Sequence, residues 1–204
     1  MVFAETDVTQ APRASGAPRG RRQPSQRLTN ILDAAECILS VRGTPGFSID
    51  TVAEAAGIAK GTVYHYFASR ELLLSAVVDR HACRLASAIK KKLAGVPEKE
   101  CASRLRIWVE DVCGDFVENY ALYGARPAAT WGTFPLVTSL AALLCRPDEE
   151  LDLSAPASQA CAVFLFAGLR GCVEDSIARD RFDETTIESV YRHFLMTLNL
   201  GLSR

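Results

Sequence analysis

Apolar residues recur along most of this chain at three- and four-residue spacing, which is the period of an amphipathic helix. The pattern predicts helices over residues 25–41, 49–56, 60–67, 69–93, 98–123, 157–179 and 184–202, with one short and one longer helix between 128 and 145. Gly43 and Gly57 follow the first two helices, where glycine readily takes the left-handed conformation that ends a helix. The expected fold class is therefore all-α.

The stretch from residue 48 to residue 67 has the pattern of two short helices joined by a tight turn. Ser48 is a favourable N-cap, and Asp50 suits the positive end of the first helix. Gly57 ends that helix, and the second begins near Lys60. A helix, a glycine-containing turn and a second helix form the helix-turn-helix pattern of DNA-binding proteins.

The second of these helices divides into two faces at 100° per residue. Val63 and Phe67 fall on the side that packs inward. The opposite side carries no carboxylate and combines a cation, a glycine, hydroxyl groups and rings with polar edges: Lys60, Gly61, Thr62, Tyr64 and His65. A lysine that reaches phosphate and side chains that hydrogen-bond base edges are what binding in a major groove requires.

The run GTPGFSIDTVAEAAGIAKGTVYHYFASRELLLSAVV resembles the DNA-binding domain of the TetR family of bacterial transcriptional repressors. The resemblance covers about residues 25–78, a quarter of the chain. It implies a three-helix helix-turn-helix domain over 25–72 and a larger helical domain for ligand binding and dimerisation over 73–204. It also implies a homodimer that represses transcription from a palindromic double-stranded DNA operator. The residues expected to contact DNA are Ser48, Lys60, Gly61, Thr62, Tyr64, His65, Tyr66 and Arg70.

The C-terminal half contains no comparable motif, so its sites are inferred from apolar residues alone. Aromatic residues along the predicted helices are candidates for an effector pocket, namely Trp108, Phe116, Tyr120, Tyr123, Trp131, Phe134 and Phe164. They favour an apolar or aromatic small molecule. The last two helices are apolar on more than one side, and the resemblance implies that they pair across a two-fold axis. The expected interface comprises Gly168, Gly171, Ile187, Val190, Tyr191, Phe194 and Leu198.

Charge is distributed unevenly along the 204 residues, although the formal net charge is only −1. Residues 11–30 carry five arginines and no acidic residue, whereas Asp148, Glu149, Glu150 and Asp152 cluster in the C-terminal half. Residues 1–24 have the composition of a disordered arm. Two interpretations remain open for this arm: a mobile tail, or a basic segment that follows phosphates or enters a minor groove.

Several classes of function receive no support from the sequence. It contains no GxSxG, HExxH or Gly-rich phosphate loop, so we expect no enzyme activity, metal or cofactor. The seven cysteines lack metal-site spacing and are interpreted mostly as small buried apolar residues. No signal peptide or membrane span is expected, which favours the cytoplasm. The alternative function is a DNA-binding dimer without a small-molecule ligand, in which the C-terminal half serves protein interaction or thiol sensing.

Overall fold

A computed structural model describes residues 24–123, 132–145 and 155–202 of the chain. Within these ranges no strand occurs, which confirms the all-α prediction. The helices in chain order are α1 (Pro24–Arg42), α2 (Ile49–Ala56), α3 (Lys60–Tyr66), α4 (Arg70–Leu93), α5 (Cys101–Glu118), α6 (Tyr120–Tyr123), α7 (Pro135–Leu144), α8 (Ala155–Ala178) and α9 (Glu184–Leu202).

The predicted signals hold at the end of α1 and at both ends of α2. Gly43 and Gly57 have φ values of +62° and +64°, in the left-handed region that glycine tolerates. Ser48 Oγ accepts a hydrogen bond from the Thr51 amide at 3.1 Å. Ser69 Oγ accepts one from the Leu72 amide at 3.2 Å, and so caps α4. Leu72 itself is 55% exposed, because it lies in the first turn of α4 and faces away from the core.

The single helix predicted over 98–123 is instead two helices. α5 ends at Glu118, and Asn119 has non-helical dihedral angles (φ −118°, ψ 29°). The Asn119 side chain donates to Asp115 Oδ1 at 3.0 Å, one turn back. Asparagine commonly interrupts helices because its side chain forms such local hydrogen bonds. The break allows α6 to leave the axis of α5.

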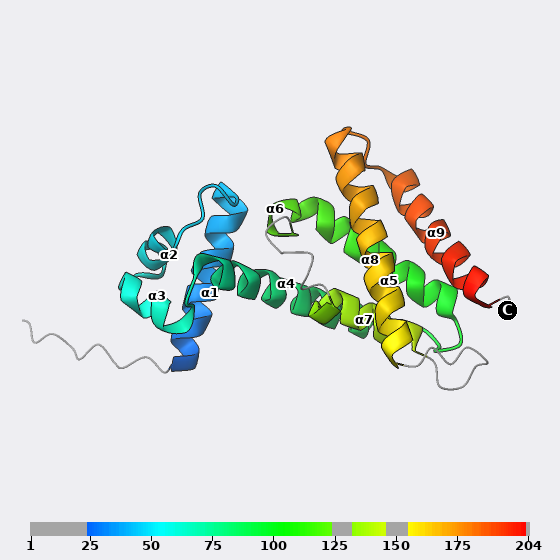
Figure 1. The fold of residues 1–204 in the computed structure, drawn as a ribbon, viewed down its shortest axis with the longest axis horizontal. Coiled ribbons are helices and arrows are strands. Elements are labelled where there is room, and N and C mark those ends of the chain that lie inside the picture. Colours follow the sequence, from blue (N-terminus) through cyan, green and yellow to red (C-terminus); the bar gives the residue numbers. More distant parts are fainter. Residues whose placement is uncertain (1–23, 124–131, 146–154, 203–204) are drawn as a thin grey trace, which may run out of the picture.

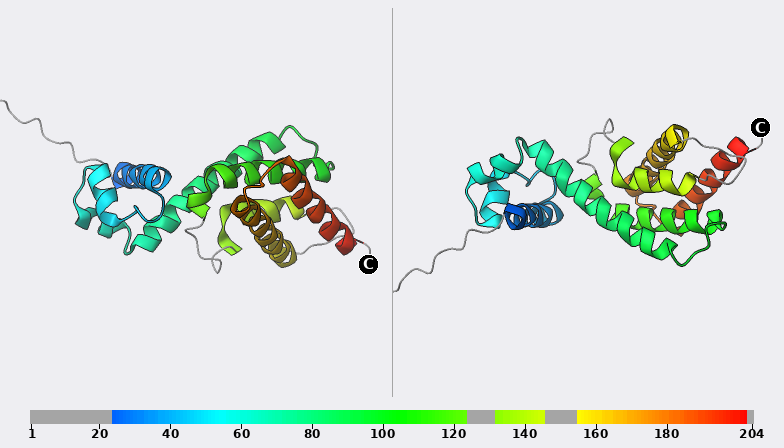
Figure 2. Two further views of the ribbon diagram at one scale, coloured as in Figure 1. Left: turned by 90° about the horizontal axis from the view of Figure 1, so that it is seen from above. Right: turned by 90° about the horizontal axis from the view of Figure 1, so that it is seen from below.

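Two hydrophobic cores organise the molecule. The N-terminal core joins α1, α2 and α3 to the first two turns of α4, through Ile31, Leu39, Phe47, Val52, Val63, Leu73 and Val77 among others. The C-terminal core lies among α4, α5, α7, α8 and α9. The long helix α4 runs from one core into the other (Figures 1 and 2). Its residue Val77 belongs to the N-terminal core, and the next residue, Val78, belongs to the C-terminal core.

The short helix α6 also contributes to both cores. Leu122 is buried in the N-terminal core, next to residues of α1. Its neighbour Tyr123 is buried in the C-terminal core. Residues 25–72 therefore do not form a closed hydrophobic unit, because α4 and α6 complete it. Among the described helices, none has both the length and the apolar character needed to cross a bilayer.

Candidate functional site

The turn between α2 and α3 fixes the direction of α3. Ser48 and Thr51 form a reciprocal capping box at the start of α2. At the other end, the amide of Gly57 donates to Glu54 O and that of Ile58 donates to Ala53 O. Val63 is fully buried and attaches α3 to the N-terminal core. The polar face of α3 is consequently turned outward.

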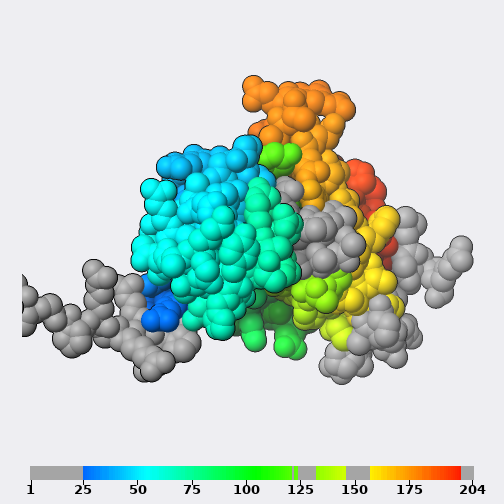
Figure 3. Space-filling view, turned by 60° about the vertical axis from the view of Figure 1, so that its left-hand side comes forward, coloured from blue at the N-terminus to red at the C-terminus, as the bar shows by residue number. Residues whose placement is uncertain are grey.

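The residues predicted to face DNA lie on that outer face. Lys60, Gly61, Tyr64 and His65 are exposed, and Thr62 is half-buried. Tyr64 is 47% exposed, a high value for an aromatic side chain. A Cβ added at Gly61 would meet no atom within 4 Å, so this position offers open backbone. The C-terminal helices leave α2 and α3 uncovered, as the cyan surface in Figure 3 shows.

Two other members of the predicted set are partly occupied within the protein. Ser48 is half-buried, and its hydroxyl caps α2. Tyr66 is half-buried and packs against the N-terminal core, with its ring 5.6 Å from that of His65 in an edge-to-face arrangement. Tyr66 follows the buried Val63 by three residues, so it lies close to the inward side of α3. The exposed area of α3 therefore comes mainly from Lys60, Gly61, Tyr64 and His65.

Arg70 differs most from its predicted role as a phosphate contact. Its Nε donates to the Phe47 carbonyl at 2.9 Å, and its Nη2 donates to the Thr44 carbonyl at 2.8 Å. The guanidinium also lies 5.6 Å from the centroid of the Phe47 ring. These contacts tie the loop between α1 and α2 to the start of α4. Nε and Nη2 of Arg70 therefore support the helix-turn-helix, whereas Nη1 lies 3.8 Å from Glu71 Oε1 near the surface, and a phosphate contact by Arg70 stays a prediction.

The aromatic residues proposed for an effector pocket mostly form packed core. Trp108, Phe116, Tyr123 and Phe134 are almost completely buried. The rings of Phe116 and Tyr123 stack with centroids 3.9 Å apart, so these two fill space rather than enclose it. Tyr120 and Phe164 face outward, with 42% and 68% of their surfaces exposed, and do not line an interior site. Trp131 lies outside the described residues.

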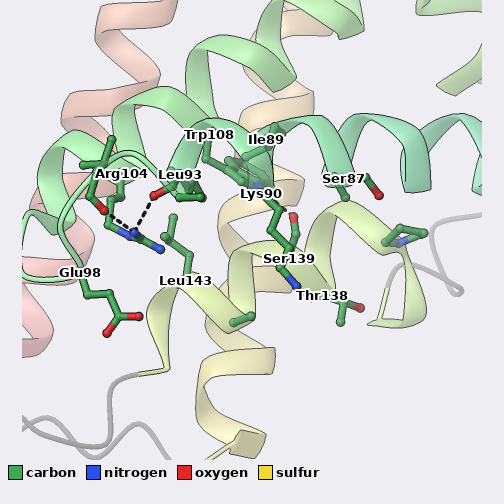
Figure 4. Close-up of a pocket in the computed structure, with 15 residues that line it drawn as sticks. Ser87, Ile89, Lys90, Leu93, Glu98, Arg104, Trp108, Thr138, Ser139 and Leu143 are labelled. Atoms are coloured by element: carbon green, nitrogen blue, oxygen red, sulfur yellow. Dashed lines mark hydrogen bonds between the residues drawn. The ribbon is translucent and has the colours of Figure 1, made fainter.

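A surface groove that the sequence did not indicate lies between α4, the start of α5 and α7. It has a volume of about 720 Å³. Its apolar wall comes from Ile89, Leu93, Val96, Trp108 and Leu143, and its polar groups include Ser87, Lys90, Arg104, Thr138 and Ser139. Figure 4 shows Lys90 and Ser139 over the middle of the groove and Arg104 at one end. Trp108 Nε1 donates to Ser139 Oγ at 2.9 Å, and Arg104 Nη1 donates to the carbonyls of Leu93 and Val96. Of the six predicted residues that the structure describes, only Trp108 lines this groove.

The predicted dimer contacts divide into two groups. Val190, Tyr191 and Phe194 are buried within the subunit, and the Tyr191 hydroxyl donates to the Ala102 carbonyl of α5 at 3.1 Å. The apolar side of α9 packs on α5, so these three side chains are not available to a second subunit. Ile187 and Leu198 are half-buried against the same core.

Gly168 and Gly171 are exposed on α8, on the same side as Ala160 and Phe164. This spacing of three to four residues forms a continuous stripe along the helix. Met196 is 60% exposed on α9, which packs beside α8. We call Ala160, Phe164, Gly168, Gly171 and Met196 the outer α8–α9 face.

The prediction that most cysteines are buried is wrong. Cys37, Cys83, Cys145 and Cys172 are exposed, Cys101 and Cys161 are half-buried, and only Cys113 is buried. Cysteine is small enough to lie at helix edges as well as in cores, so apolar neighbours in sequence did not decide its exposure. Within the described ranges, no group of three or more His, Cys, Asp or Glu side chains is arranged to hold a metal ion.

Comparison with known proteins places these features in a family. The model of the family described as "Bacterial regulatory proteins, tetR family" matches residues 31–77. An uncharacterized HTH-type transcriptional regulator of Mycobacterium tuberculosis is 38% identical over 101 residues, which are 50% of this chain and 49% of that protein. The HTH-type transcriptional activator FasR of Mycolicibacterium smegmatis is 34% identical over 107 residues, 52% of this chain and 48% of that protein. The matched region thus spans about half the length of these curated relatives.

A solved structure extends the likeness of fold beyond the N-terminal region. A TetR-family transcriptional regulator from Streptomyces coelicolor superposes with a TM-score of 0.64 at 20% identity. The superposition covers 85% of this chain and 98% of that one, so the arrangement of the C-terminal helices is shared as well. The sequence matches and the shared fold agree with the capped helix-turn-helix described above. Residues 31–77 therefore match the helix-turn-helix domain of the tetR family of bacterial regulatory proteins.

Proposed function

We propose that this chain is a DNA-binding transcriptional regulator that reads its operator with α3. The observation that carries the proposal is the outward face of α3, where Lys60, Gly61, Tyr64 and His65 are exposed and no carboxylate belongs to the helix. Lysine and open backbone suit phosphate, whereas tyrosine, threonine and histidine can contact base edges. Ser48 and Tyr66 remain secondary members of this set.

The proposal includes a homodimer, because one recognition helix contacts too few base pairs for a specific site. The outer α8–α9 face supplies a surface for it, since Phe164 is exposed on α8 along with two glycines that allow close approach, and Met196 is exposed on α9. Two copies of α3 would then lie in successive major grooves about 34 Å apart. Such an arrangement matches a palindromic operator.

The proposal also includes control by a small, largely apolar or aromatic effector. The groove between α4, α5 and α7 supports it, because its wall is mostly apolar and α4 leads directly to the N-terminal core. The two dimer conformations differ in the spacing of their recognition helices. An effector shifts the equilibrium between them only as far as its affinities for the two conformations differ. Release from the operator would relieve repression.

The experiment begins with sequencing of the genomic fragments that the purified chain retains. Tyr64→Ala and Thr62→Ala are then measured on the recovered site and on random DNA. If α3 reads bases, each substitution costs about 1–3 kcal/mol on the recovered site and much less on random DNA. Tyr120→Ala is the matched control, because Tyr120 is similarly exposed but lies on α6. Equal losses on both DNAs would exclude base reading by these side chains.

The alternative is a DNA-binding dimer whose C-terminal half binds no small molecule. The exposure of four cysteines favours the variant of this alternative in which thiols respond to oxidants. Operator binding that changes with oxidation, and not with any apolar compound that occupies the groove, would support that alternative.

A further inference from the structure

A cluster of charged and polar side chains joins the two cores, and the DNA-binding proposal makes no use of it. It lies one turn beyond Val77 and Val78, where α4 passes from the N-terminal core to the C-terminal core. Its centre is His81, of which about one sixth of the side chain is exposed. No residue of the cluster lies on the outward face of α3 or lines the groove.

His81 contacts both neighbouring parts of the molecule. On one side, Nε2 lies 2.9 Å from each carboxylate oxygen of Asp115 on α5. On the other side, Nδ1 lies 3.7 Å from Glu36 Oε1 on α1. Asp115 also accepts hydrogen bonds from the Asn119 amide at 3.0 Å and from the Tyr123 hydroxyl. The imidazole therefore bridges α1 to α5 and α6.

The charges of the cluster around His81 favour its protonated form. Carboxylates come from α1 (Asp33 and Glu36) and from α5 (Asp115), and guanidinium groups come from α4 itself (Arg80 and Arg84). Tyr123 of α6 adds a hydroxyl, and burial raises the pKa of this phenol, so it stays neutral. Three carboxylates and two guanidinium groups leave one negative charge. A proton on His81 balances it.

The pKa directions agree with this balance. The hydrogen bond with Asp115 raises the pKa of His81 above its usual 6.5, against the effects of burial and of Arg84. Burial acts to raise the pKa of Asp115, but the hydrogen bonds from His81 and Tyr123 hold it below the usual range. Burial likewise opposes ionisation of Glu36, and Arg84 and Arg80 outweigh it. Among these side chains histidine is the one whose ordinary pKa lies closest to neutral, and the hydrogen bond with Asp115 raises the pKa of His81 from there.

The partners of His81 are themselves attached to the two cores. Tyr123 stacks on Phe116 in the C-terminal core, and its neighbour Leu122 is buried among residues of the N-terminal core. Glu36 lies on α1, which packs directly on α2. A change in the bond between His81 and Asp115 can therefore reach the helix-turn-helix by two routes, through α6 and through α1.

We propose that His81 is a positioning residue for DNA binding, whose proton fastens α1 to α5 and α6 and whose loss loosens that junction. The DNA part of this inference rests on the proposed function. Because the folded pKa is raised, the stabilising contribution is fully present below pH 6.5 and is lost as the pH rises through the folded value. The junction is thus tight in mildly acidic solution and loosens as the pH rises through the folded pKa of His81.

The first arm of the test uses NMR on the full chain without DNA. The His81 ring signal is expected to titrate above pH 6.5, and the amide signals of Glu36 and Leu122 to follow the same midpoint. His81→Gln can still donate to Asp115 but carries no charge, so these amides should lose that titration. His193→Gln, at an exposed histidine of α9, should leave it unchanged. A titration midpoint of the His81 ring at or below pH 6.5 would overturn the inference. Amide signals of Glu36 and Leu122 that do not change at the His81 midpoint would overturn it as well.

The second arm measures operator affinity from pH 6 to pH 9. His65 is also a histidine and lies on the proposed DNA face, so every protein in this arm carries His65→Gln. The affinity is expected to change about fivefold or more through the His81 midpoint, the range of ordinary allosteric coupling. Addition of His81→Gln should make the profile flat. A flat profile with His81 present would remove its role in DNA binding. If the chain with its own His65 binds no DNA at any pH, the proposed function fails, whereas the NMR arm still decides whether the junction responds to the proton.

Discussion

Lys60 Nζ lies 2.7 Å from Asp50 Oδ1, so the lysine that begins the proposed recognition helix is paired within the protein. The hydrogen bond with Asp50 raises the pKa of Lys60, and the ammonium stays charged at neutral pH. Its Nζ is also 6.0 Å from the centroid of the Tyr64 ring. A phosphate that contacts Lys60 must therefore compete with a carboxylate on the neighbouring helix. Asp50 is expected to weaken DNA binding.

Asp50→Asn tests this competition directly. We expect tighter binding to operator and random DNA alike, because Lys60 becomes free to contact phosphate. The slope of log affinity against log salt should steepen by up to about one unit, the value for one added phosphate contact. Glu54→Gln removes a charge from the same helix at an exposed position and serves as the control. If both variants gain equally, net charge rather than the Lys60 pair is responsible.

Arg70→Ala should act on stability before it acts on DNA. The substitution removes two charge-assisted hydrogen bonds to main-chain carbonyls in the loop between α1 and α2. We expect a loss of about 1–3 kcal/mol in the free energy of unfolding, measured by urea denaturation. The salt dependence of DNA affinity should change little. Arg70→Lys keeps the charge but cannot reproduce both bonds, so partial destabilisation with that variant would support the same reading.

Features that depend on local interactions could be predicted from the sequence, whereas features that depend on contacts between distant residues could not. Helix caps depend on local backbone geometry, so residue type alone indicates them. The caps at Ser48, Gly57 and Ser69 are present in the structure. The outward face of α3 followed from helical periodicity once Val63 was taken as the buried residue. Local signals of this kind do not depend on which distant segments pack nearby.

The roles that were not predicted depend on contacts between distant residues. Arg70 bonds to carbonyls 23 and 26 residues earlier, and His81 to Asp115 spans 34 residues. Aromatic composition did not distinguish residues that line a cavity from residues that fill a core, since Phe116 and Tyr123 stack on each other. The groove between α4, α5 and α7 arises from the placement of three helices and has no sequence motif.

The reactivity of the cysteines provides a test of their corrected exposure. Iodoacetamide at pH 8, followed by mass spectrometry, should modify Cys37, Cys83, Cys145 and Cys172 first. Cys113 should react last, because burial raises the pKa of its thiol to about 12 and thiolate is the reactive form. Early labelling of Cys113 in the folded chain would contradict its position in the C-terminal core.

Phe164→Glu tests the outer α8–α9 face as the dimer contact. Phe164 is 68% exposed, so a glutamate there costs a single subunit little, whereas a dimer that buries this side chain must also bury a charge. Sedimentation should show dimers of the unaltered chain and monomers of the variant. The monomeric variant should bind the operator far more weakly than the unaltered chain. At the same low protein concentration, the two proteins should have the same melting temperature. Val41→Glu adds the same charge at an exposed apolar residue of α1 and should leave the dimer intact. A Phe164→Glu protein that remains dimeric would move the interface away from this face, because no partner surface that encloses a phenylalanine accepts an unpaired carboxylate without loss of affinity.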